Sequence, residues 1–365
     1  MEISIKAHLT RSSGFVIDVD IIIPPVGITA LYGPSGSGKS TLLKLIAGLE
    51  RGSDNDHIEI TSGSTVWQND KIFVPAEKRS IGYVFQQHQL FPHLSVQGNL
   101  DFAIKRQHVQ STIDFDQVAQ WLDIQPLLNK KITQLSGGEA QRVAMARVLL
   151  SGARCILMDE PLGAIDSAAR ARILPYLDRL HRNLEIPMIY VSHSFDEITY
   201  LADQLFVLNN GKVSRSGSLF ELSSDLELAS GQGDASATVI QCRVHDHDKK
   251  YDLSELNFED TSIFVNAQSH SIGDLVRVRI PARDVSIATS RPENSSILNI
   301  IKVEIVSFEE AHDRSVLVRL RRNKQFLLAR ITRKSMSTLS LHSGQQVYAQ
   351  IKSVALLNKS NVSTQ

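Results

Sequence analysis

Gly33-Pro34-Ser35-Gly36-Ser37-Gly38-Lys39-Ser40-Thr41 matches the pattern GxxxxGK[ST]. It follows an apolar run, residues 27–32, that is typical of a buried strand, and it leads into residues 39–49, which are typical of a helix. Glycines let backbone N–H groups turn toward phosphate oxygens, and a helix N-terminus attracts the same negative charge. A glycine- and serine-rich surface turn is the alternative, but the strand and helix on either side favour a nucleoside triphosphate site. We expect the whole stretch to line it, with Lys39 on the β- and γ-phosphates and Ser40 on Mg²⁺.

The surrounding sequence has the pattern of an α/β layer. Roughly the first 220 residues alternate short apolar runs with segments of helical periodicity, which favours a largely parallel sheet. Residues 155–158 and 188–191 are too short for helices and are followed at once by polar residues. Both are predicted to be central strands whose carboxyl ends carry functional side chains.

Composition limits the classes of partner and compartment. Lys plus Arg and Asp plus Glu number 39 each, so no excess charge indicates nucleic acid or an anionic membrane as the main partner. The two cysteines, Cys155 and Cys242, lie far apart, which fits a reducing, cytosolic setting. The first residues lack the features of a signal peptide, and no run of ~18 apolar residues occurs. We therefore expect a cytosolic chain that does not cross a bilayer.

The C-terminal part has a different texture. Residues 223–237 lose periodicity and are predicted to be a linker. Beyond them, residues 276–280 and 316–320 alternate apolar and polar side chains, and residues 321–324 would turn the second of these strands into the next. This is the pattern of a small β-rich domain, expected to be a compact barrel.

Polar side chains follow the two predicted central strands. Asp159 and Glu160 end the first, where Asp159 can hold Mg²⁺ and Glu160 can polarise an attacking water molecule. His193 ends the second. Acidic residues at strand ends are often only turn formers, and a single histidine there is often only a polar terminus. These residues are therefore candidates that need further support from the rest of the sequence.

Leu135-Ser136-Gly137-Gly138-Glu139 leads into a helical segment, residues 140–150. Glycines at a helix N-terminus suit a γ-phosphate that approaches from outside. The alternative is a capped helix start, which Ser136 and Glu139 would satisfy as a capping box.

Taken in order, these elements resemble the ATP-binding cassette (ABC) family. After the phosphate loop come Val84-Phe85-Gln86-Gln87, the stretch from Leu135, the pair Asp159 and Glu160, the stretch Gly163-Ala164-Ile165-Asp166, and finally His193. Together they span about 160 residues, and the resemblance covers roughly residues 1–225. It implies an α/β P-loop NTPase domain that hydrolyses ATP with Mg²⁺.

The resemblance also implies roles for individual side chains. Gln86 would touch the Mg²⁺ shell near the contact with a membrane subunit, and His193 would contact the γ-phosphate and sense its loss. Ser136, Gly137 and Gly138 would contact the ATP of a second copy, and Asp166 would cross the interface between the two copies. Phe15 is the candidate to stack on adenine.

The C-terminal sequence resembles the ATP-binding subunits of molybdate importers and their oxyanion-binding Mop repeat. The resemblance rests on residues 278–287, 291–299 and 344–355, together with residues 91–100 of the first domain. It implies an ABC ATPase domain at residues 1–230, a linker and β-rich segment at 231–290, and a Mop/TOBE domain with an OB-like barrel at 291–361.

Within this barrel the resemblance suggests a site for a tetrahedral dianion. Hydroxyl, amide and cationic groups can bind such an anion by charge-assisted hydrogen bonds. A basic residue often precedes the asparagine in stand-alone Mop proteins, whereas Leu298 stands here, and a purely structural barrel is the alternative. The candidates are Ser296, Asn299, Lys352 and Ser353.

Two other features of this region have simpler interpretations. His245-Asp246-His247-Asp248 has metal-ligand residue types but is better read as a solvated hairpin turn. A nucleic-acid role would need more base-stacking aromatics than Phe326.

The resemblance as a whole implies an ATPase subunit of a molybdate importer, bound to the cytoplasmic face of the inner membrane. It implies a homodimer, transmembrane permease subunits and an external molybdate-binding protein, with no nucleic acid. The alternatives are an importer ATPase for sulfate, a sugar or a polyamine, and, from another class, a nucleic-acid-associated ABC ATPase.

Overall fold

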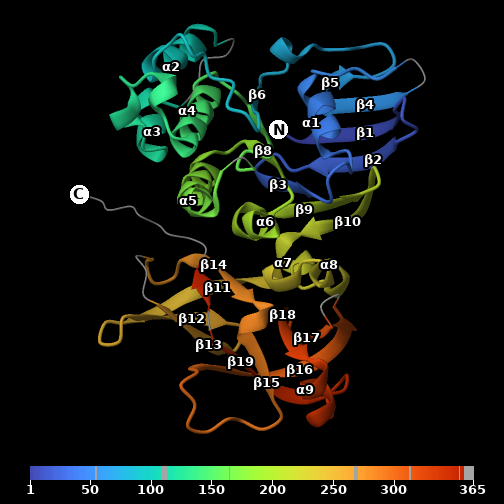
Figure 1. Ribbon diagram of the computed structural model, residues 1–365, viewed down its shortest axis with the longest axis vertical. Helices are drawn as coiled ribbons and strands as arrows, with labels where there is room; N and C mark the ends of the chain where they lie inside the picture. Colours follow the sequence, from blue (N-terminus) through green and yellow to red (C-terminus); the bar gives the residue numbers. More distant parts are fainter. Residues whose placement is uncertain are drawn as a thin grey trace. The chain divides into compact units, whose positions relative to one another are not determined.

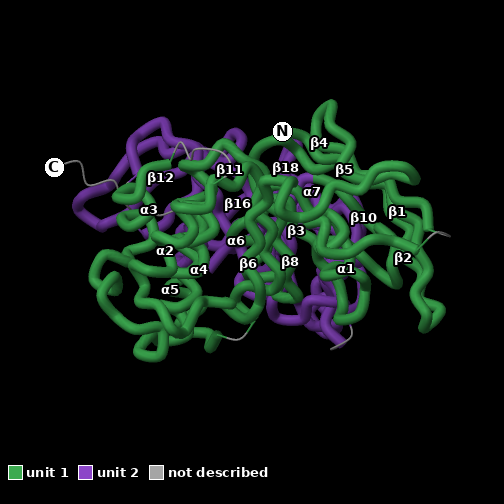
Figure 2. The backbone as a smooth tube through the Cα atoms, turned by 90° about the horizontal axis from the view of Figure 1, so that it is seen from above, with its two compact units in different colours: residues 1–217 green, residues 218–365 purple. Residues whose placement is uncertain are grey.

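A computed structural model describes residues 1–53, 56–107, 113–163, 165–266, 270–311, 314–352 and 354–356. The chain forms two compact units, Met1–Gly217 and Ser218–Gln365 (Figures 1 and 2). The division falls before residue 230, where the sequence analysis placed the end of the first domain.

The first unit is built on one ten-stranded sheet of order β5-β4-β1-β2-β10-β9-β3-β8-β7-β6. The strands β9, β3, β8, β7 and β6 run parallel, whereas β1, β2, β4 and β5 pair antiparallel. Their bounds are β1 Ile3–Thr10, β2 Val16–Ile23, β3 Gly27–Tyr32, β4 His57–Ser62, β5 Thr65–Gln68, β6 Ile81–Val84, β7 Cys155–Asp159, β8 Pro187–Ser192, β9 Gln204–Asn209 and β10 Lys212–Ser218.

The predicted central strands are confirmed. Every residue of β8 is buried, as are the first four of β7, because helices cover both faces of a parallel sheet. Strands β1 and β2 instead alternate buried and exposed side chains.

Helices pack against the parallel strands of this sheet, and α2, α3 and α4 form a separate group beside β6 (Figure 1). The helices are α1 Lys39–Ala47, α2 Val96–Lys105, α3 Phe115–Trp121, α4 Gly137–Leu149, α5 Ser167–Asn183 and α6 Phe195–Leu201. Three short 3-10 turns add η1 Ala76–Lys78, η2 Gln125–Leu127 and η3 Ile132–Gln134.

The topology brings four turns to one edge of the sheet. Strands β3, β8, β7 and β6 are parallel neighbours, so their carboxyl ends lie side by side. The phosphate loop follows β3, His193 follows β8, Glu160 follows β7, and Gln86 lies just after β6. Four segments that are distant in sequence therefore meet at one site.

The second unit contains two antiparallel sheets that share one hydrophobic core. The first has the order β13-β12-β11-β14-β20 and the second β15-β19-β16-β17-β18. The second sheet curls until its edge strands β15 and β18 are in contact, which confirms the expected barrel-like form. The strands are β11 Ala237–Asp248, β12 Leu253–Phe258, β13 Thr261–Asn266, β14 Leu275–Pro281, β15 Val285–Ala288, β16 Asn299–Glu310, β17 Ser315–Arg322, β18 Gln325–Thr332, β19 Gln346–Ile351 and β20 Ala355–Leu356.

The predicted linker is wrong. The segment contains α8 (Leu226–Ser230) and the 3-10 turn η4 (Gly233–Ala235), and it follows α7 (Leu219–Leu222) directly. Ser223 is buried, and its hydroxyl accepts a hydrogen bond from the backbone N–H of Val239 (3.0 Å). The apolar periodicity is weak here because serines take several of the buried positions, beside Leu228 and Ala229, and their hydroxyls bond to the backbone.

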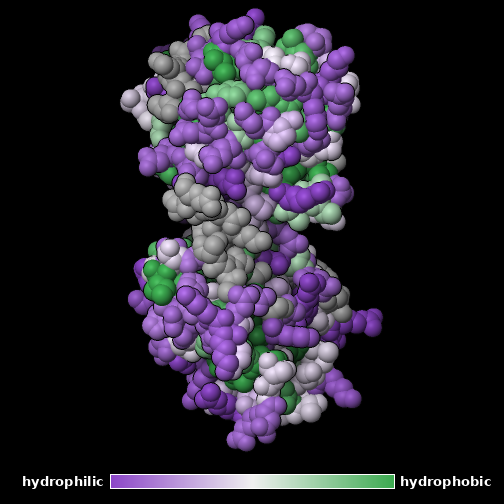
Figure 3. Space-filling view, turned by 90° about the vertical axis from the view of Figure 1, so that its left-hand side faces the viewer, coloured by the Kyte–Doolittle hydropathy of each residue, from purple (hydrophilic) through white to green (hydrophobic). Residues whose placement is uncertain are grey.

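Of the two turns predicted in the second unit, the one at residues 321–324 is present. The one at residues 245–248 is wrong, because these residues pair with β12 as part of a strand. His245 to Asp248 end β11 and precede the turn into β12, and the imidazole of His247 contacts the Ser254 hydroxyl (2.9 Å). Strands β17 and β18 form the expected hairpin, and α9 (Arg333–Thr338) follows it. The face of the molecule drawn in Figure 3 is mostly hydrophilic, with apolar side chains in small separate groups.

Candidate nucleotide-binding and hydrolysis site

The phosphate loop has a backbone that only glycine permits at two positions. Gly33 (φ 154°) lies so close to β9 that a Cβ atom would be 2.1 Å from the carbonyl oxygen of Leu208. Gly38 (φ 98°) begins α1 and would place a Cβ atom 3.0 Å from Ile17. The loop therefore passes close to β2 and β9 before the chain enters the helix.

Lys39 is held inside this loop. Its ammonium group donates to the carbonyl oxygens of Gly33 (2.9 Å) and Pro34 (2.7 Å), and it lies 3.3 Å from the Ser37 hydroxyl. Burial lowers the pKa of Lys39, and the nearby charges of Glu160 and Asp159 act in the opposite direction. The lysine charge thus lies in the field of both strand-end carboxylates.

Asp159 has a hydrogen-bond donor on each carboxylate oxygen. The Ser40 hydroxyl donates to Oδ1 (2.9 Å), and the Tyr83 hydroxyl donates to Oδ2 (3.0 Å). Burial, and then the charge of Asp159, raise the pKa of Tyr83, so the phenol stays protonated and can only donate to the carboxylate. One hydroxyl and one carboxylate oxygen form a hard-oxygen donor set that fits Mg²⁺, which takes few protein ligands beside phosphate.

Glu160 and His193 meet directly. Glu160 adopts a left-handed backbone (φ 44°), and its N–H donates to Val191 O on β8 (3.1 Å). This turn brings its carboxylate to 3.3 Å from Nδ1 of His193. The turn that follows is tight, because a Cβ atom on Gly163 would lie 3.2 Å from Gln86 Nε2 and 3.4 Å from Glu160 Oε2. The structure therefore brings Gln86, Glu160 and His193 together, as the sequence predicts.

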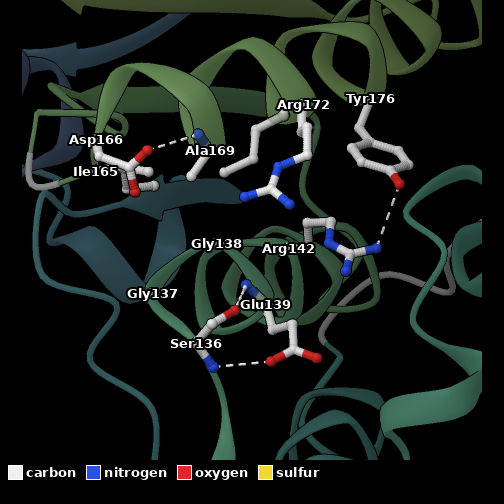
Figure 4. A pocket seen from close by; sticks show the side chains of 11 residues that line it. Ser136, Gly137, Gly138, Glu139, Arg142, Ile165, Asp166, Ala169, Arg172 and Tyr176 are labelled. Atoms are coloured by element: carbon white, nitrogen blue, oxygen red, sulfur yellow. Dashed lines mark hydrogen bonds between the residues drawn. The ribbon is translucent and has the colours of Figure 1, made fainter.

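Ser136, Gly137 and Gly138 line a pocket that is separate from the phosphate loop. Ser136 caps α4 in a reciprocal capping box, in which its N–H donates to Glu139 Oε2 (2.8 Å) and its hydroxyl accepts from the N–H of Glu139 (3.3 Å). The capping interpretation is thus correct as local structure, and it leaves both glycines lining the pocket (Figure 4).

The same pocket contains Asp166 and measures about 460 Å³. Asp166 caps α5 by accepting from the N–H of Ala169 (2.9 Å). The residues that line the pocket are Ser136, Gly137, Gly138, Glu139, Arg142, Ile165, Asp166, Ala169, Arg172, Ile173 and Tyr176. No residue of the phosphate loop is among them. The phosphate loop and this pocket are therefore separate on one chain.

Two arginines of this pocket were not predicted. The Arg142 guanidinium donates to the carbonyl oxygens of Leu122 (2.9 Å) and Asp123 (2.7 Å), which ties α4 to the end of α3. Arg172 is exposed, and its guanidinium extends into the pocket toward the first turn of α4 (Figure 4). Arg172 adds positive charge beside the glycines, whereas the charge of Arg142 is paired with Asp123 (3.2 Å). The sequence could not predict the place of either arginine in this pocket, because arginine is common on the surface of a helix.

Phe15 lies beside the phosphate loop. Its ring is 3.5 Å from the position of a Cβ atom on Gly38, and the side chain is half-buried. Phe15 therefore stays the candidate to stack on adenine, on the ground that its ring lies beside the loop.

In the second unit, the candidate oxyanion residues have different environments. Asn299 is 7% exposed, and its amide is paired with the backbone of Phe264 on β13, accepting from N–H (2.7 Å) and donating to C=O (2.9 Å). This pairing joins the two sheets and occupies the amide within the fold. Ser296 and Lys352 are exposed. Ser353 lies outside the described residues.

Comparison with known proteins agrees with this geometry. Residues 16–163 match the family described as "ABC transporter", and residues 295–357 match the "TOBE domain" family. The "Molybdenum import ATP-binding protein ModC" of Methylococcus capsulatus is 45% identical over 94% of this chain and 96% of its own length. The protein of the same name from Pseudomonas fluorescens is 45% identical over 98% of this chain and 100% of its own.

A solved structure supports the fold of the first unit. The dimeric post-hydrolysis state of the ATP-binding cassette MJ0796, bound to ADP and Pi, is 26% identical and aligns with a TM-score of 0.50. The alignment covers 59% of this chain and 98% of that one. With an ATPase cassette, a TOBE domain and near-full-length identity of this level, the chain belongs to the molybdenum import ATP-binding proteins of the ABC transporter family.

Proposed function

We propose that this chain hydrolyses ATP to energise molybdate import. The observation that carries the proposal is the meeting of Lys39, Asp159, Glu160 and His193 at the carboxyl ends of adjacent parallel strands. These side chains supply a cation for phosphate, a carboxylate for a metal ion, and a carboxylate beside a histidine for water. The relatives that match this chain over nearly its whole length carry the name of molybdenum importers.

The residues at the sheet edge divide the chemistry. Lys39 and the loop N–H groups bind phosphate oxygens, and Phe15 stacks on the base. Ser40 and Asp159 would hold Mg²⁺, with Gln86 near it, and the ion would neutralise phosphate charge. Glu160 accepts the proton of the attacking water. His193, 3.3 Å from Glu160, holds that carboxylate in place and contacts the γ-phosphate.

A second copy of the chain completes the site. The phosphate loop and the pocket of Ser136 and Asp166 are separate half-sites on one chain. In the dimer we propose, each ATP lies between the loop of one copy and the signature residues Ser136, Gly137 and Gly138 of the other. The cassette MJ0796 was solved as a dimer, which supports this arrangement. Arg172 in this pocket adds positive charge for the partner's nucleotide.

The remaining partners follow from the task of import. Among the residues described, no helix is long and apolar enough to cross a membrane. We propose that separate permease subunits provide the transmembrane path, with this chain peripheral at the cytoplasmic face of the inner membrane. An external binding protein would deliver the anion. The equal numbers of basic and acidic residues give no support to a nucleic-acid partner.

We also propose that the C-terminal domain, placed at residues 291–361, binds a tetrahedral oxyanion. Because the Asn299 amide is paired with Phe264, the exposed Ser296 and Lys352 are the residues that carry this proposal. Ser353 remains a candidate oxyanion ligand only because of the resemblance.

A transport assay tests the proposed function. In cells that lack their own molybdate-import ATPase, the wild-type chain, expressed with its cognate permease, should restore accumulation of molybdate at nanomolar to micromolar supply. Lys39→Ala should not restore it. Restoration of sulfate, sugar or polyamine uptake without molybdate uptake would contradict the substrate and leave the ATPase chemistry standing.

A further inference from the structure

A buried carboxylate lies behind the catalytic edge. Glu197, in the first turn of α6, is 3% exposed. Its Oε2 accepts hydrogen bonds from the Tyr190 hydroxyl (2.8 Å) and the Ser192 hydroxyl (2.7 Å). Burial, and then the Glu197 charge, raise the pKa of Tyr190, which keeps the phenol protonated as a donor. Burial of a carboxylate is costly unless partners compensate it, and here two hydroxyls and one cation do so.

That cation comes from the helix that follows the Asp166 loop. Arg170 Nε lies 3.2 Å from Glu197 Oε1. Its Nη2 donates to the carbonyl oxygen of Ile165 (3.3 Å), which immediately precedes Asp166. One guanidinium thus ties Glu197 to the loop of Ile165 and Asp166, which lines the pocket that also contains Ser136.

The other side of Glu197 leads to the histidine. The Ser192 hydroxyl that donates to Glu197 also accepts from the N–H of Ser194 (3.0 Å). Glu197 therefore holds the two residues that flank His193, Ser192 directly and Ser194 through the Ser192 hydroxyl. His193 in turn lies 3.3 Å from Glu160. A continuous chain of contacts therefore runs from Ile165, the residue before Asp166, to Glu160, the residue proposed to activate water.

From this geometry we propose that Glu197 and Arg170 are positioning residues, which hold the Asp166 loop in a fixed position relative to His193. This inference rests on the proposed function. Neither side chain is among the residues that we assign to the nucleotide. Contact of the Asp166 loop with a second copy would then be transmitted to the orientation of His193 and Glu160. The pair couples dimer closure to catalysis, so its loss should lower turnover rather than ATP binding.

The test compares Glu197→Gln with a matched control on α5. Glutamine keeps the size of the side chain and can still accept from a hydroxyl, but it loses the ion pair. Asp178→Asn removes another largely buried ion pair, Asp178 with Arg182 (2.5 Å), that lies farther along the same helix. We expect Glu197→Gln to lower kcat by about tenfold or more with the KM for ATP changed by less than about threefold. Asp178→Asn should lower the melting temperature while kcat stays near wild type.

A double-mutant cycle completes the test. Arg170→Lys keeps the positive charge but replaces the fork that reaches both Glu197 and Ile165. If the two residues act as one unit, the double variant should be no slower than Glu197→Gln alone. Three outcomes would each overturn the inference. They are a double variant in which the two single losses of kcat multiply, a kcat for Glu197→Gln within about twofold of wild type, and an equal loss of kcat in Asp178→Asn. If Glu197→Gln fails to fold, the same comparison of kcat and KM is made with Arg170→Lys, whose buried partner keeps a cation. A wild-type protein without ATPase activity would instead refute the proposed function, so the two failures are distinguishable.

Discussion

Tyr83→Phe isolates one of the two hydrogen bonds that hold Asp159. The phenol donates to Oδ2 at 3.0 Å, whereas Ser40 donates to Oδ1 at 2.9 Å. Phenylalanine keeps the ring and its stacking on Phe85, where the ring centroids are 4.2 Å apart. The substitution therefore removes one donor from Asp159 with little change in packing.

The size of the effect follows from the environment of the carboxylate. A hydrogen bond to a charged group contributes about 1.5–3 kcal/mol. Because Asp159 is only half-buried, water replaces part of the lost bond, and the low end of that range applies. A loss of about 1.4 kcal/mol weakens a binding equilibrium tenfold. The Mg²⁺ concentration for half-maximal ATPase activity should therefore rise about tenfold.

The assay is a Mg²⁺ titration of ATPase activity at saturating ATP. The pKa of Tyr83 is raised by burial and by Asp159, so the phenol stays protonated and the deficit should be constant from about pH 6 to 9. Tyr200→Phe removes another largely buried phenol, whose pKa is raised to about 12, and should leave the titration unchanged. An unchanged Mg²⁺ requirement in Tyr83→Phe, with normal folding, would refute the assignment of Asp159 as metal ligand.

Three further predictions concern other parts of the chain. Ser136→Arg should abolish ATP-driven dimerisation in sedimentation experiments while ATP binding survives. The control Ser95→Arg, which removes the equivalent cap of α2, should still dimerise with ATP. Dimers of Ser136→Arg would contradict the assignment of Ser136 to the partner's nucleotide. The pKa of Glu139 is lowered by the Ser136 N–H and then by Lys130, so its stabilising contribution is complete above its ordinary pKa and is lost as pH falls through the folded value. Between about pH 5 and 3 the wild type should therefore lose more stability than Glu139→Gln, measured by urea unfolding, and parallel losses would contradict this. Millimolar molybdate should raise the melting temperature of the full chain more than sulfate does, and Lys352→Ala or Ser296→Ala should remove the shift; the absence of a shift in the wild type would leave the barrel a structural module.

The strand-end residues could be predicted because their chemistry is encoded locally. The phosphate loop, Asp159 with Glu160, and His193 each follow a short apolar run, and parallel strands bring such ends to one edge. The sequence also separated the two units into α/β and β-rich parts, since the change from helical periodicity to alternation is visible without tertiary information.

The parts that were missed depend on packing between distant segments. Tyr83 looks like an ordinary strand residue until the register beside β7 places its hydroxyl on Asp159. Glu197 would be read as an exposed charge at a helix start, and only the packing of α6 beside α5 buries it against Arg170. Asn299 shows the same limit, because its pairing with Phe264 depends on how the two sheets meet.

The central claim is that ATP is hydrolysed between two copies of the chain with Glu160 activating water, and Glu160→Gln tests it most directly. The substitution keeps the side-chain size and the phosphate loop but removes the base. ATPase activity and sedimentation should be measured on the same sample with Mg²⁺ and ATP. We expect turnover to fall by at least ~100-fold while ATP still binds and holds the protein as a dimer. Turnover within a few-fold of wild type, or a protein that stays monomeric with saturating ATP, would contradict the account.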